Sequence, residues 1–400
     1  MPFHGSNRGS NPLGDATPVI EVRGAGFTNK GAQLMLLAAR DRLFARYPAA
    51  KLTMTTSHSA GTSPFAQVVR AGFFPKAELW RWGIPWGDFV GLMPRKAREM
   101  GGVVLDRDVD AVLDISGFAY SDQWGGRALH QAARSAHRWR KQGTKLILLP
   151  QAFGPIKDQA NQAAFRRLLA SADLVFARDA LSEDWVRRFT PHPDGVRRAP
   201  DFTNLIDGIP PQSPSDFEDV VAITPNYRML DKTDAKTRER YIPFLVSAVE
   251  RVARARLRPL LLIHEGEPDR LLAEQVLNRA GRGEILVEPD PLKLKGILGC
   301  CAAAIGSRYH GLVSCLSQGV PALGTSWSHK YKALFEDYDF SSGLIDLCDH
   351  LSAEHQLDLL LDPQWRLAMR GKLQSRALAL RYEAERMWDE IYGLLEGADK

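Results

Sequence analysis

Residues 302–311 read Ala-Ala-Ala-Ile-Gly-Ser-Arg-Tyr-His-Gly, and this stretch decides the fold. A short apolar run ends at Gly306 and a polar turn follows, after which a helix is predicted from about Gly311 to Gly319. Pro321 then opens another apolar run, which predicts the next strand. This order of strand, turn, helix and strand is typical of a parallel α/β sheet.

The turn within this stretch carries an arginine and a histidine, Arg308 and His310. Ligands of open α/β sheets bind beyond the carboxyl ends of the strands, where the free N–H groups of a helix start attract anions. An arginine offers a planar fork for a carboxylate or phosphate, and a histidine can move a proton near neutral pH. We therefore predict a site for a small anion whose chemistry needs an acid or a base. The alternative is that Arg308 caps the preceding strand through carbonyl contacts and that His310 is a buried histidine with satisfied hydrogen bonds.

The composition is that of a soluble globular protein, with 44% apolar and 25% charged residues in a chain of 400. This length exceeds one ordinary hydrophobic core, so two domains are expected. The formal net charge is +5 and is spread along the chain. It suits an anionic small molecule or an acidic membrane surface, but it is too small and too diffuse to indicate a nucleic-acid-binding protein.

No segment of the sequence indicates export or membrane insertion. Residues 1–18 are rich in Gly, Ser, Asn and Pro and lack the apolar core of a signal peptide. No apolar run approaches the ~18 residues of a membrane span, so we expect a cytoplasmic protein. Reduced thiols are expected at the four cysteines, rather than disulfides or zinc ligands, because their surroundings are mostly apolar. These cysteines are Cys300, Cys301, Cys315 and Cys348.

Strands and helices alternate on both sides of a segment with three prolines, residues 208–219, which is the best candidate for a linker. We predict a disordered tail over residues 1–17, an N-terminal α/β domain over 18–207, and a C-terminal α/β domain with a terminal helix over 220–400. Both are expected to be doubly wound, Rossmann-like domains with the ends of their strands facing a central cleft.

Several strand exits in the first half carry residues that suit a substrate site. A Gly-rich loop that includes Asn29 follows the first strand and lets a ligand approach the backbone closely. Gln151 and Arg178 each follow an apolar run, which places them where substrates bind in parallel sheets. The alternative for Arg178 is a salt bridge to Asp179, which is predicted to cap the next helix.

Residues 80–98 combine three tryptophans with four basic residues. Exposed tryptophans stack on sugars or lie at membrane interfaces, and basic neighbours favour anionic lipid. This segment therefore indicates a peripheral contact with a membrane face. The alternative is tryptophan-rich packing between helices.

Taken together, these motifs resemble the polysaccharide pyruvyl transferase family. Two features depart from the family pattern, because Ala32 stands where the family often has an aspartate and the loop 114–117 has fewer glycines than usual. The matching pieces follow the order of the family from about residue 22 to 332. They are Asn29-Lys30-Gly31-Ala32, residues 149–155, Ala177-Arg178-Asp179 with Ser182, Arg308-Tyr309-His310, Gly319-Val320-Pro321 and Lys330.

The resemblance implies a GT-B-like fold and the transfer of a pyruvyl group from phosphoenolpyruvate to a sugar of a polysaccharide or its precursor, with formation of a pyruvate ketal. The sugar acceptor, free or lipid-linked, would lie on the N-terminal domain, with Asn29 and Gln151 as candidate substrate-binding residues. Phosphoenolpyruvate would lie on the C-terminal domain. A lipid-linked acceptor would bring the protein to the inner face of the membrane. Neither a cofactor nor a metal is implied, and nucleic acid is not an expected partner.

The resemblance also suggests roles for the individual residues. Arg308 would hold the carboxylate of phosphoenolpyruvate, while Arg178 and Lys330 would hold or neutralise its phosphate. His310 would act as the acid and base, because ketal formation protonates C3 of the donor and then removes hydroxyl protons from the sugar. The alternative for Lys330 is an ordinary surface lysine. His264, which ends a predicted strand, is expected to be a core histidine, although it could line the cleft.

Two other functions remain open from the sequence. One is a GT-B-type glycosyltransferase that uses a sugar nucleotide. The other is a non-catalytic relative that binds a glycan or an anion, and the two departures from the family pattern favour it. A thermal-shift comparison of phosphoenolpyruvate with a nucleotide sugar separates these functions, because a ligand that prefers the native state raises the melting midpoint.

Overall fold

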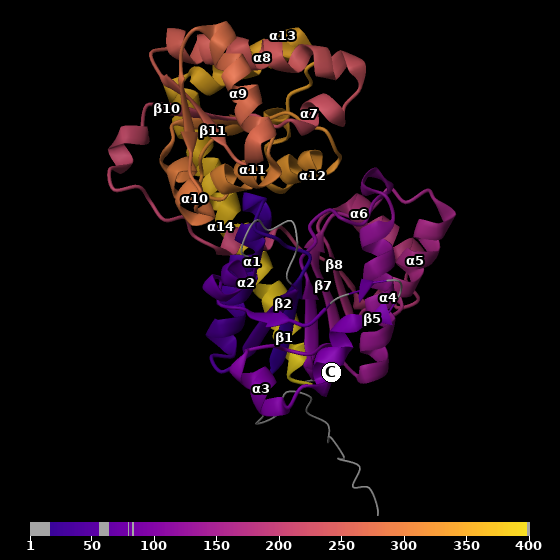
Figure 1. The fold of residues 1–400 in the computed structure, drawn as a ribbon. Coiled ribbons are helices and arrows are strands. Elements are labelled where there is room, and N and C mark those ends of the chain that lie inside the picture. The colour runs from indigo at the N-terminus through magenta and orange to yellow at the C-terminus, as the bar shows by residue number, and fades with distance from the viewer. Residues whose placement is uncertain (1–16, 56–63, 79, 82–83, 398–400) are drawn as a thin grey trace, which may run out of the picture. The chain divides into compact units, whose positions relative to one another are not determined.

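The computed structural model describes residues 17–55, 64–78, 80–81 and 84–397 of the chain (Figure 1). The predicted tail therefore falls, up to residue 16, outside the described residues. The chain packs as two compact units. The first consists of Met1–Phe27, Met35–Ala199 and Glu385–Lys400, and the second consists of Thr28–Leu34 and Pro200–Ala384.

The first unit contains a seven-stranded parallel sheet in the order β3-β2-β1-β6-β7-β8-β9. Its strands are β1 Val19–Arg23, β2 Lys51–Thr55, β3 Phe74–Lys76, β6 Ala111–Asp114, β7 Lys145–Gln151, β8 Leu174–Ala177 and β9 Val196–Arg198. Two very short strands, β4 Trp80–Arg81 and β5 Ile84–Pro85, pair antiparallel. Its helices are α1 Lys30–Arg46, whose first turn groups with the second unit, α2 Pro64–Arg70, α3 Arg95–Met100, α4 Arg127–Gln142, α5 Gln159–Leu169 and α6 Ala180–Phe189.

The second unit contains a five-stranded parallel sheet in the order β12-β11-β10-β13-β14. Its strands are β10 Val220–Thr224, β11 Arg258–Ile263, β12 Glu284–Val287, β13 Ala303–Gly306 and β14 Ala322–Gly324. Its helices are α7 Arg228–Asp231, α8 Ala235–Arg254, α9 Gly266–Ala280, α10 Pro291–Cys300, α11 Tyr309–Leu316, α12 Lys330–Asp337, α13 His350–Leu361 and most of α14 Pro363–Leu395. None of the helices in the described residues combines the length and the apolar content that a bilayer crossing requires.

The central strands form parallel sheets because they are apolar and covered on both faces. Every residue of β8, β10 and β13 is buried, as expected for strands enclosed by crossover helices. Several helices start at polar capping residues. Asp179 accepts a hydrogen bond from the Ser182 N–H at 2.8 Å, which confirms its predicted capping of α6. Asp290 caps α10 in the same way through the Leu292 N–H.

The strand, turn, helix and strand predicted around residues 302–324 are confirmed as β13, α11 and β14. The helix begins at Tyr309 rather than near Gly311, because Arg308 already has extended backbone angles and serves as its N-cap. The two parallel sheets, each connected through helices, confirm the predicted α/β class with two doubly wound domains. The cleft between the domains remains a prediction.

The compact units divide the chain at residues other than the predicted ones. Pro200 already belongs to the second unit, and the proline-rich segment 208–219 packs within it, since the Ile209 N–H donates to the Leu292 carbonyl at 2.9 Å. The end of α14 groups with the first unit. There the Tyr392 hydroxyl donates to the Arg42 carbonyl of α1 at 2.9 Å.

Candidate functional site

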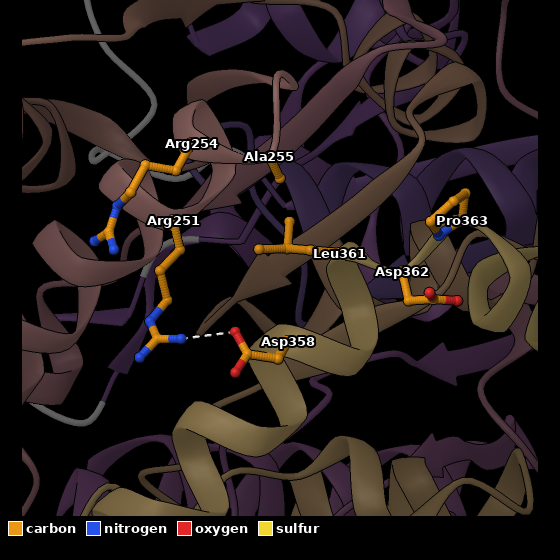
Figure 2. Close-up of a pocket in the computed structure, with 7 residues that line it drawn as sticks. All are labelled: Arg251, Arg254, Ala255, Asp358, Leu361, Asp362 and Pro363. Carbon is orange, nitrogen blue, oxygen red and sulfur yellow. Dashed lines mark hydrogen bonds and ion pairs between the residues drawn. The ribbon is translucent and has the colours of Figure 1, made fainter.

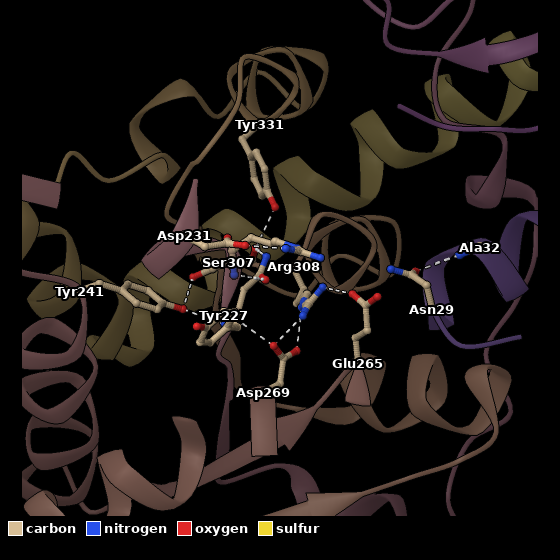
Figure 3. A network of polar contacts seen from close by, with 12 residues as sticks. Asn29, Ala32, Tyr227, Asp231, Tyr241, Glu265, Asp269, Ser307, Arg308 and Tyr331 are labelled. Atoms are coloured by element: carbon tan, nitrogen blue, oxygen red, sulfur yellow. Dashed lines mark hydrogen bonds and ion pairs between the residues drawn. The ribbon is translucent and has the colours of Figure 1, made fainter. Parts of the chain in front are cut away.

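The turn after β13 is held in place by a buried network of hydrogen bonds (Figure 3). The Ser307 carbonyl accepts hydrogen bonds from Asn226 Nδ2 at 2.6 Å and from the Tyr331 hydroxyl at 2.8 Å. The Ser307 hydroxyl shares hydrogen bonds with the Tyr241 hydroxyl at 2.7 Å and with Thr325 Oγ1 at 2.6 Å. Partners from four other segments therefore fix the backbone from which Arg308 projects, at the carboxyl end of the sheet.

Arg308 is buried and bound to two carboxylates. Its Nε and Nη2 donate to the two oxygens of Asp269 at 2.8 and 2.5 Å, which makes a bidentate pair, and its Nη1 donates to Glu265. Burial would lower the pKa of Arg308, but Asp269 and Glu265 raise it, and the net shift is upward, so the guanidinium stays charged. The alternative was that Arg308 caps the preceding strand through contacts with carbonyl groups. The structure differs, because the partners of Arg308 are acidic side chains after β11 and in α9.

These contacts leave part of the guanidinium available to a ligand. Three of the five N–H groups of Arg308 are used within the described residues, so two remain. Asp269 is the better-fixed partner, because its side chain is fully buried and it also accepts from the Tyr227 N–H at 3.0 Å. Glu265 is 29% exposed and is the partner that an anion would displace more easily.

His310 lies in the first turn of α11 between an aspartate and a glycine. Its Nε2 is 3.4 Å from Asp201 Oδ2, within ion-pair distance, and its side chain is 13% exposed. A Cβ at Gly31 would lie 2.1 Å from His310 Nδ1, so only glycine leaves room for the ring there. The ring also meets the ring of Tyr309 edge to face at 5.2 Å. A carboxylate at Nε2 favours the tautomer with its proton on that atom, which leaves Nδ1 as the nitrogen that can take up a proton.

A second histidine of the same region lacks hydrogen-bond partners within the described residues. His264 follows β11, is 2% exposed, and both of its ring nitrogens are buried and unpaired. It packs against the first turn of α11, because a Cβ at Gly311 would be 3.5 Å from its Cδ2. Burial lowers the pKa of His264 well below its usual value and the charge of Arg308 lowers it further, so the ring is neutral at pH 7. Both nitrogens lie near the start of α11, whose N–H groups favour anions.

Lys330 lies against three aromatic rings rather than on an open surface. Its Nζ is 4.7 Å from the ring centre of Trp327, 5.2 Å from that of Tyr309 and 5.7 Å from that of Tyr331. Cation–π attraction of this kind holds an ammonium group in a defined place. Because Tyr309 separates Arg308 from His310 in the sequence, Lys330 belongs to the surroundings of the same turn.

Asn29 acts as a helix cap in the structure. Its Oδ1 accepts from the Ala32 N–H at 3.1 Å, at the start of α1. The residue after it reaches the second sheet, since Lys30 Nζ donates to the Pro289 carbonyl at 2.7 Å. Together with the contact of Gly31 with His310, this bond places residues 28–34 beside the Arg308 turn, within the second unit.

Gln151 and Arg178 lie at the carboxyl edge of the first sheet. Gln151 is the last residue of β7, is fully buried, and neither atom of its side-chain amide has a hydrogen-bond partner within the described residues. Arg178 follows the neighbouring strand β8 and is 3% exposed, and its N–H donates to the Gln151 carbonyl at 3.1 Å. An unsatisfied buried amide costs roughly 1–3 kcal/mol.

Three residues around the site were not predicted from the sequence. Asp201, Glu265 and Asp269 each contact a predicted site residue through the tertiary structure alone. His264, which was expected to be a core histidine, is buried. A local signal existed for His264 and Glu265, because both follow an apolar strand. Among the described residues, no group of three or more His, Cys, Asp or Glu side chains is placed to hold a metal ion.

A cavity of about 390 Å³ lies elsewhere in the second unit (Figure 2). It is built from the end of α8 and the junction of α13 with α14 and contains none of the predicted site residues. Two of its four charged groups pair with each other, Arg251 with Asp358 at 2.6 Å. We assign it no function. Its lining residues are Arg251, Arg254, Ala255, Asp358, Leu361, Asp362 and Pro363.

The solved structures that are similar to this chain show its fold. Anabaena HepE, crystallised with UDP and glucose, matches with a TM-score of 0.58 at 13% identity, over 95% of this chain and 99% of that chain. A glycosyltransferase from Rickettsia africae ESF-5 matches with a TM-score of 0.59 at 11% identity, over 95% and 99%. A putative UDP-N-acetylglucosamine 2-epimerase from Listeria monocytogenes matches with a TM-score of 0.61 at 12% identity, over 96% and 98%. These similarities confirm the predicted GT-B-like fold.

Sequence comparison adds a family. The family model described as polysaccharide pyruvyl transferase matches residues 29–329, which is well over half of the chain and includes every predicted site residue except Lys330. A search of curated proteins found no match.

Proposed function

Because the chain belongs to the polysaccharide pyruvyl transferase family, we propose that it transfers a pyruvyl group from phosphoenolpyruvate to a sugar of a polysaccharide or its precursor and forms a pyruvate ketal. The observation that carries the proposal is the turn at the start of α11. It combines a fixed guanidinium, Arg308, with an imidazole, His310, at the carboxyl end of a parallel sheet. A guanidinium can bind a small anion, and an imidazole beside it can transfer a proton to or from that anion.

The donor would bind at this turn through its carboxylate. The N–H groups of Arg308 that are not bound to Asp269 would bind the carboxylate, which takes the place of Glu265, while Asp269 keeps the guanidinium oriented. The N–H groups at the start of α11 receive no side-chain cap and favour an anion. His264 supports this position, because its neutral ring can donate one hydrogen bond and accept another.

His310 would perform the proton transfers. As an imidazolium, the ring would protonate C3 of phosphoenolpyruvate, which leaves a positive centre at C2. A sugar hydroxyl then attacks C2 and returns its proton to the ring. The bond between C2 and the phosphate oxygen breaks, a second hydroxyl attacks C2 and closes the ketal, and its proton leaves with the phosphate. Asp201 would act as a positioning residue that sets the tautomer and stabilises the imidazolium.

The remaining candidates would bind the rest of the substrates. Lys330, held by its aromatic neighbours, and Arg178, on the first unit, would neutralise phosphate. Gln151 would bind hydroxyl groups of the acceptor sugar, because its amide offers one acceptor and two donors that have no partner in the described residues. Asn29 would act mainly by capping α1, so that Gly31 stays against His310. The acceptor would be a free or lipid-linked sugar.

Melting curves with and without millimolar phosphoenolpyruvate test the donor. We expect a higher midpoint for the wild type, no rise with Arg308→Ala, and an unchanged rise with Arg254→Ala, a control at an exposed arginine. Inorganic phosphate and pyruvate, tested separately, show whether both ends of the donor are needed. Product formation is then measured as phosphate release together with a pyruvylated sugar in the mass spectrum. Absence of any rise with phosphoenolpyruvate, with or without sugar acceptors, would contradict the proposal.

A sugar-nucleotide-dependent glycosyltransferase is the second candidate. One solved structure of similar fold contains UDP and glucose, although its identity to this chain is only 13%. A midpoint that rises with UDP-glucose and stays unchanged with phosphoenolpyruvate would favour this function. Binding of phosphoenolpyruvate without any product would instead favour a non-catalytic relative.

A further inference from the structure

Exposed apolar side chains are concentrated in one part of the first unit. Of the seventeen large apolar side chains that are exposed among the described residues, seven lie between residues 65 and 100. Leu92 and Met100 are 83% and 88% exposed, and Met93 and Phe89 are 48% and 55% exposed. Single exposed apolar residues are ordinary, but four of them within the twelve residues 89–100 point to an interaction surface at this segment.

Phe89 and Leu92 belong to the short 3-10 helix Trp86–Leu92, Met93 lies in the bend that follows it, and Met100 is the last residue of α3. No residue of α3 is buried, so packing against the core does not explain why this helix carries apolar residues. Its end is joined to the preceding turn, since the Arg98 Nε donates to the Met93 carbonyl at 3.4 Å. We call Phe89, Leu92, Met93 and Met100, with the basic residues around them, the α3 surface.

Basic side chains surround these apolar residues. Arg95, 84% exposed, and Lys96 follow Met93 within α3. Arg107 lies against the same segment, because a Cβ at Gly91 would be 3.1 Å from its Nη2. The pKa of Glu99 is lowered by its hydrogen bond to Arg95 and also by the nearby charge of Lys51.

The local charge is positive among the side chains that the structure describes. Five basic residues stand against two acidic residues, which is an excess of three positive charges. The basic residues are Lys51, Arg95, Lys96, Arg98 and Arg107, and the acidic ones are Glu99 and Asp108. Apolar side chains within a positively charged rim are complementary to a bilayer that contains anionic lipid.

We propose that the α3 surface docks the protein onto an anionic lipid bilayer, with Leu92, Met93 and Met100 entering the boundary between headgroups and acyl chains and Arg95 and Lys96 contacting lipid phosphates. A second copy of the chain fits less well, because a two-fold contact would bring the same positive excess to both sides. The proposal does not depend on the reaction that the protein catalyses. The tryptophans at 80, 82 and 86, which first indicated a membrane face, have side chains outside the described part of the structure.

Co-sedimentation of the full chain with vesicles tests this proposal. Vesicles of phosphatidylcholine with about 30% phosphatidylglycerol should bind at least tenfold more protein than vesicles of phosphatidylcholine alone, and added salt should weaken the binding. The apolar variant Leu92→Ser/Met93→Ser/Met100→Ser should lose about tenfold or more of this binding. Its matched control is Leu351→Ser/Leu367→Ser/Leu378→Ser, which changes equally exposed residues of α13 and α14 and should bind like the wild type.

A double variant with reversed charges tests the contribution of the basic residues separately from that of the apolar residues. Arg95→Glu/Lys96→Glu should reduce binding to anionic vesicles and remove most of its salt dependence. The control Arg254→Glu/Lys332→Glu, at two exposed basic residues outside this surface, should leave both the binding and its salt dependence unchanged. Melting midpoints are recorded for every variant and should match the wild type, because all of these side chains are exposed.

Three results would overturn the proposal. The first is equal sedimentation with the two kinds of vesicle. The second is undiminished binding by the apolar variant. The third comes from light scattering on a size-exclusion column: a dimeric wild type that becomes monomeric with the apolar variant would show that the surface joins two copies of the chain.

Discussion

Asp201 Oδ2 lies 3.4 Å from His310 Nε2, and the two side chains are only 4% and 13% exposed. The other oxygen of Asp201 accepts hydrogen bonds from the N–H of Thr203 at 3.0 Å and from its hydroxyl at 2.6 Å, which fixes the carboxylate. On its opposite side the imidazole meets Gly31. The ring therefore lies between two parts of the chain that are distant from it in the sequence.

Replacement of His310 by alanine should lower turnover by about a hundredfold or more, because the acid and base of the reaction is lost. Binding of phosphoenolpyruvate, measured as the rise in melting midpoint, should largely remain, since Arg308 and the start of α11 are intact. Initial rates of phosphate release check the first part. His355→Ala, at an exposed histidine of α13, is the control. Near-normal turnover would favour the alternative that His310 is a buried histidine without a catalytic role.

Replacement of Asp201 by asparagine should lower kcat by roughly tenfold and change KM for phosphoenolpyruvate little, because it weakens the orientation of His310 and not the binding of the donor. The asparagine keeps an oxygen that can accept from Thr203, so the local turn is preserved. The pH profile of kcat should also shift, which a purely structural role would not cause. A proportional rise in KM with an unchanged pH profile would argue against this role.

The substitution Arg308→Lys should abolish most of the stabilisation by phosphoenolpyruvate, even though the charge is kept. A lysine cannot reproduce the fork that binds Asp269 and a ligand carboxylate at the same time. Titration calorimetry with phosphoenolpyruvate measures the loss, and Arg254→Lys serves as the exposed control. Wild-type affinity in Arg308→Lys would remove this residue from the donor site.

Replacement of Glu265 by glutamine should tighten binding of phosphoenolpyruvate several-fold, up to about tenfold. Glu265 competes with an anionic ligand for Arg308 and repels it, and its partial exposure limits the size of the effect. Glu267→Gln, at an exposed carboxylate that pairs with Arg270, is the matched control and should bind like the wild type. Weaker binding in Glu265→Gln would indicate that Glu265 orients Arg308 rather than competing for it.

Because of His264, we expect the free energy of unfolding to depend on pH. Its pKa is lowered in the folded state, so the unfolded chain binds more protons and the free energy of unfolding falls as the pH drops below about 6.5. The contribution of one such group is at most ~1.36 kcal/mol per pH unit within this window. Urea unfolding between pH 7.5 and 5 should therefore show a shallower dependence for His264→Gln than for the wild type. His350→Gln, at a histidine that is 73% exposed, should retain the wild-type slope, and equal slopes in all three proteins would contradict the prediction.

The sequence predicted the elements of this fold well because their signals are local. Apolar runs bounded by glycine and proline located the central strands, and Asp179 was recognised as a helix cap from its position alone. The helix after Arg308 was placed two residues late, because the capping role of Arg308 depends on its backbone angles and not on its residue type.

The sequence by itself determined that Arg308 and His310 share one turn at the end of a parallel strand, because that follows from strand and helix periodicity within ten residues. Only the tertiary structure decided what surrounds them. Asp201 and Gly31 reach His310 from segments far away in the chain, and Asp269 reaches Arg308 across the sheet. Such contacts depend on the crossover connections that bring the carboxyl ends of parallel strands to one edge. The distances between residues across that edge cannot be read from the order of residues along the chain.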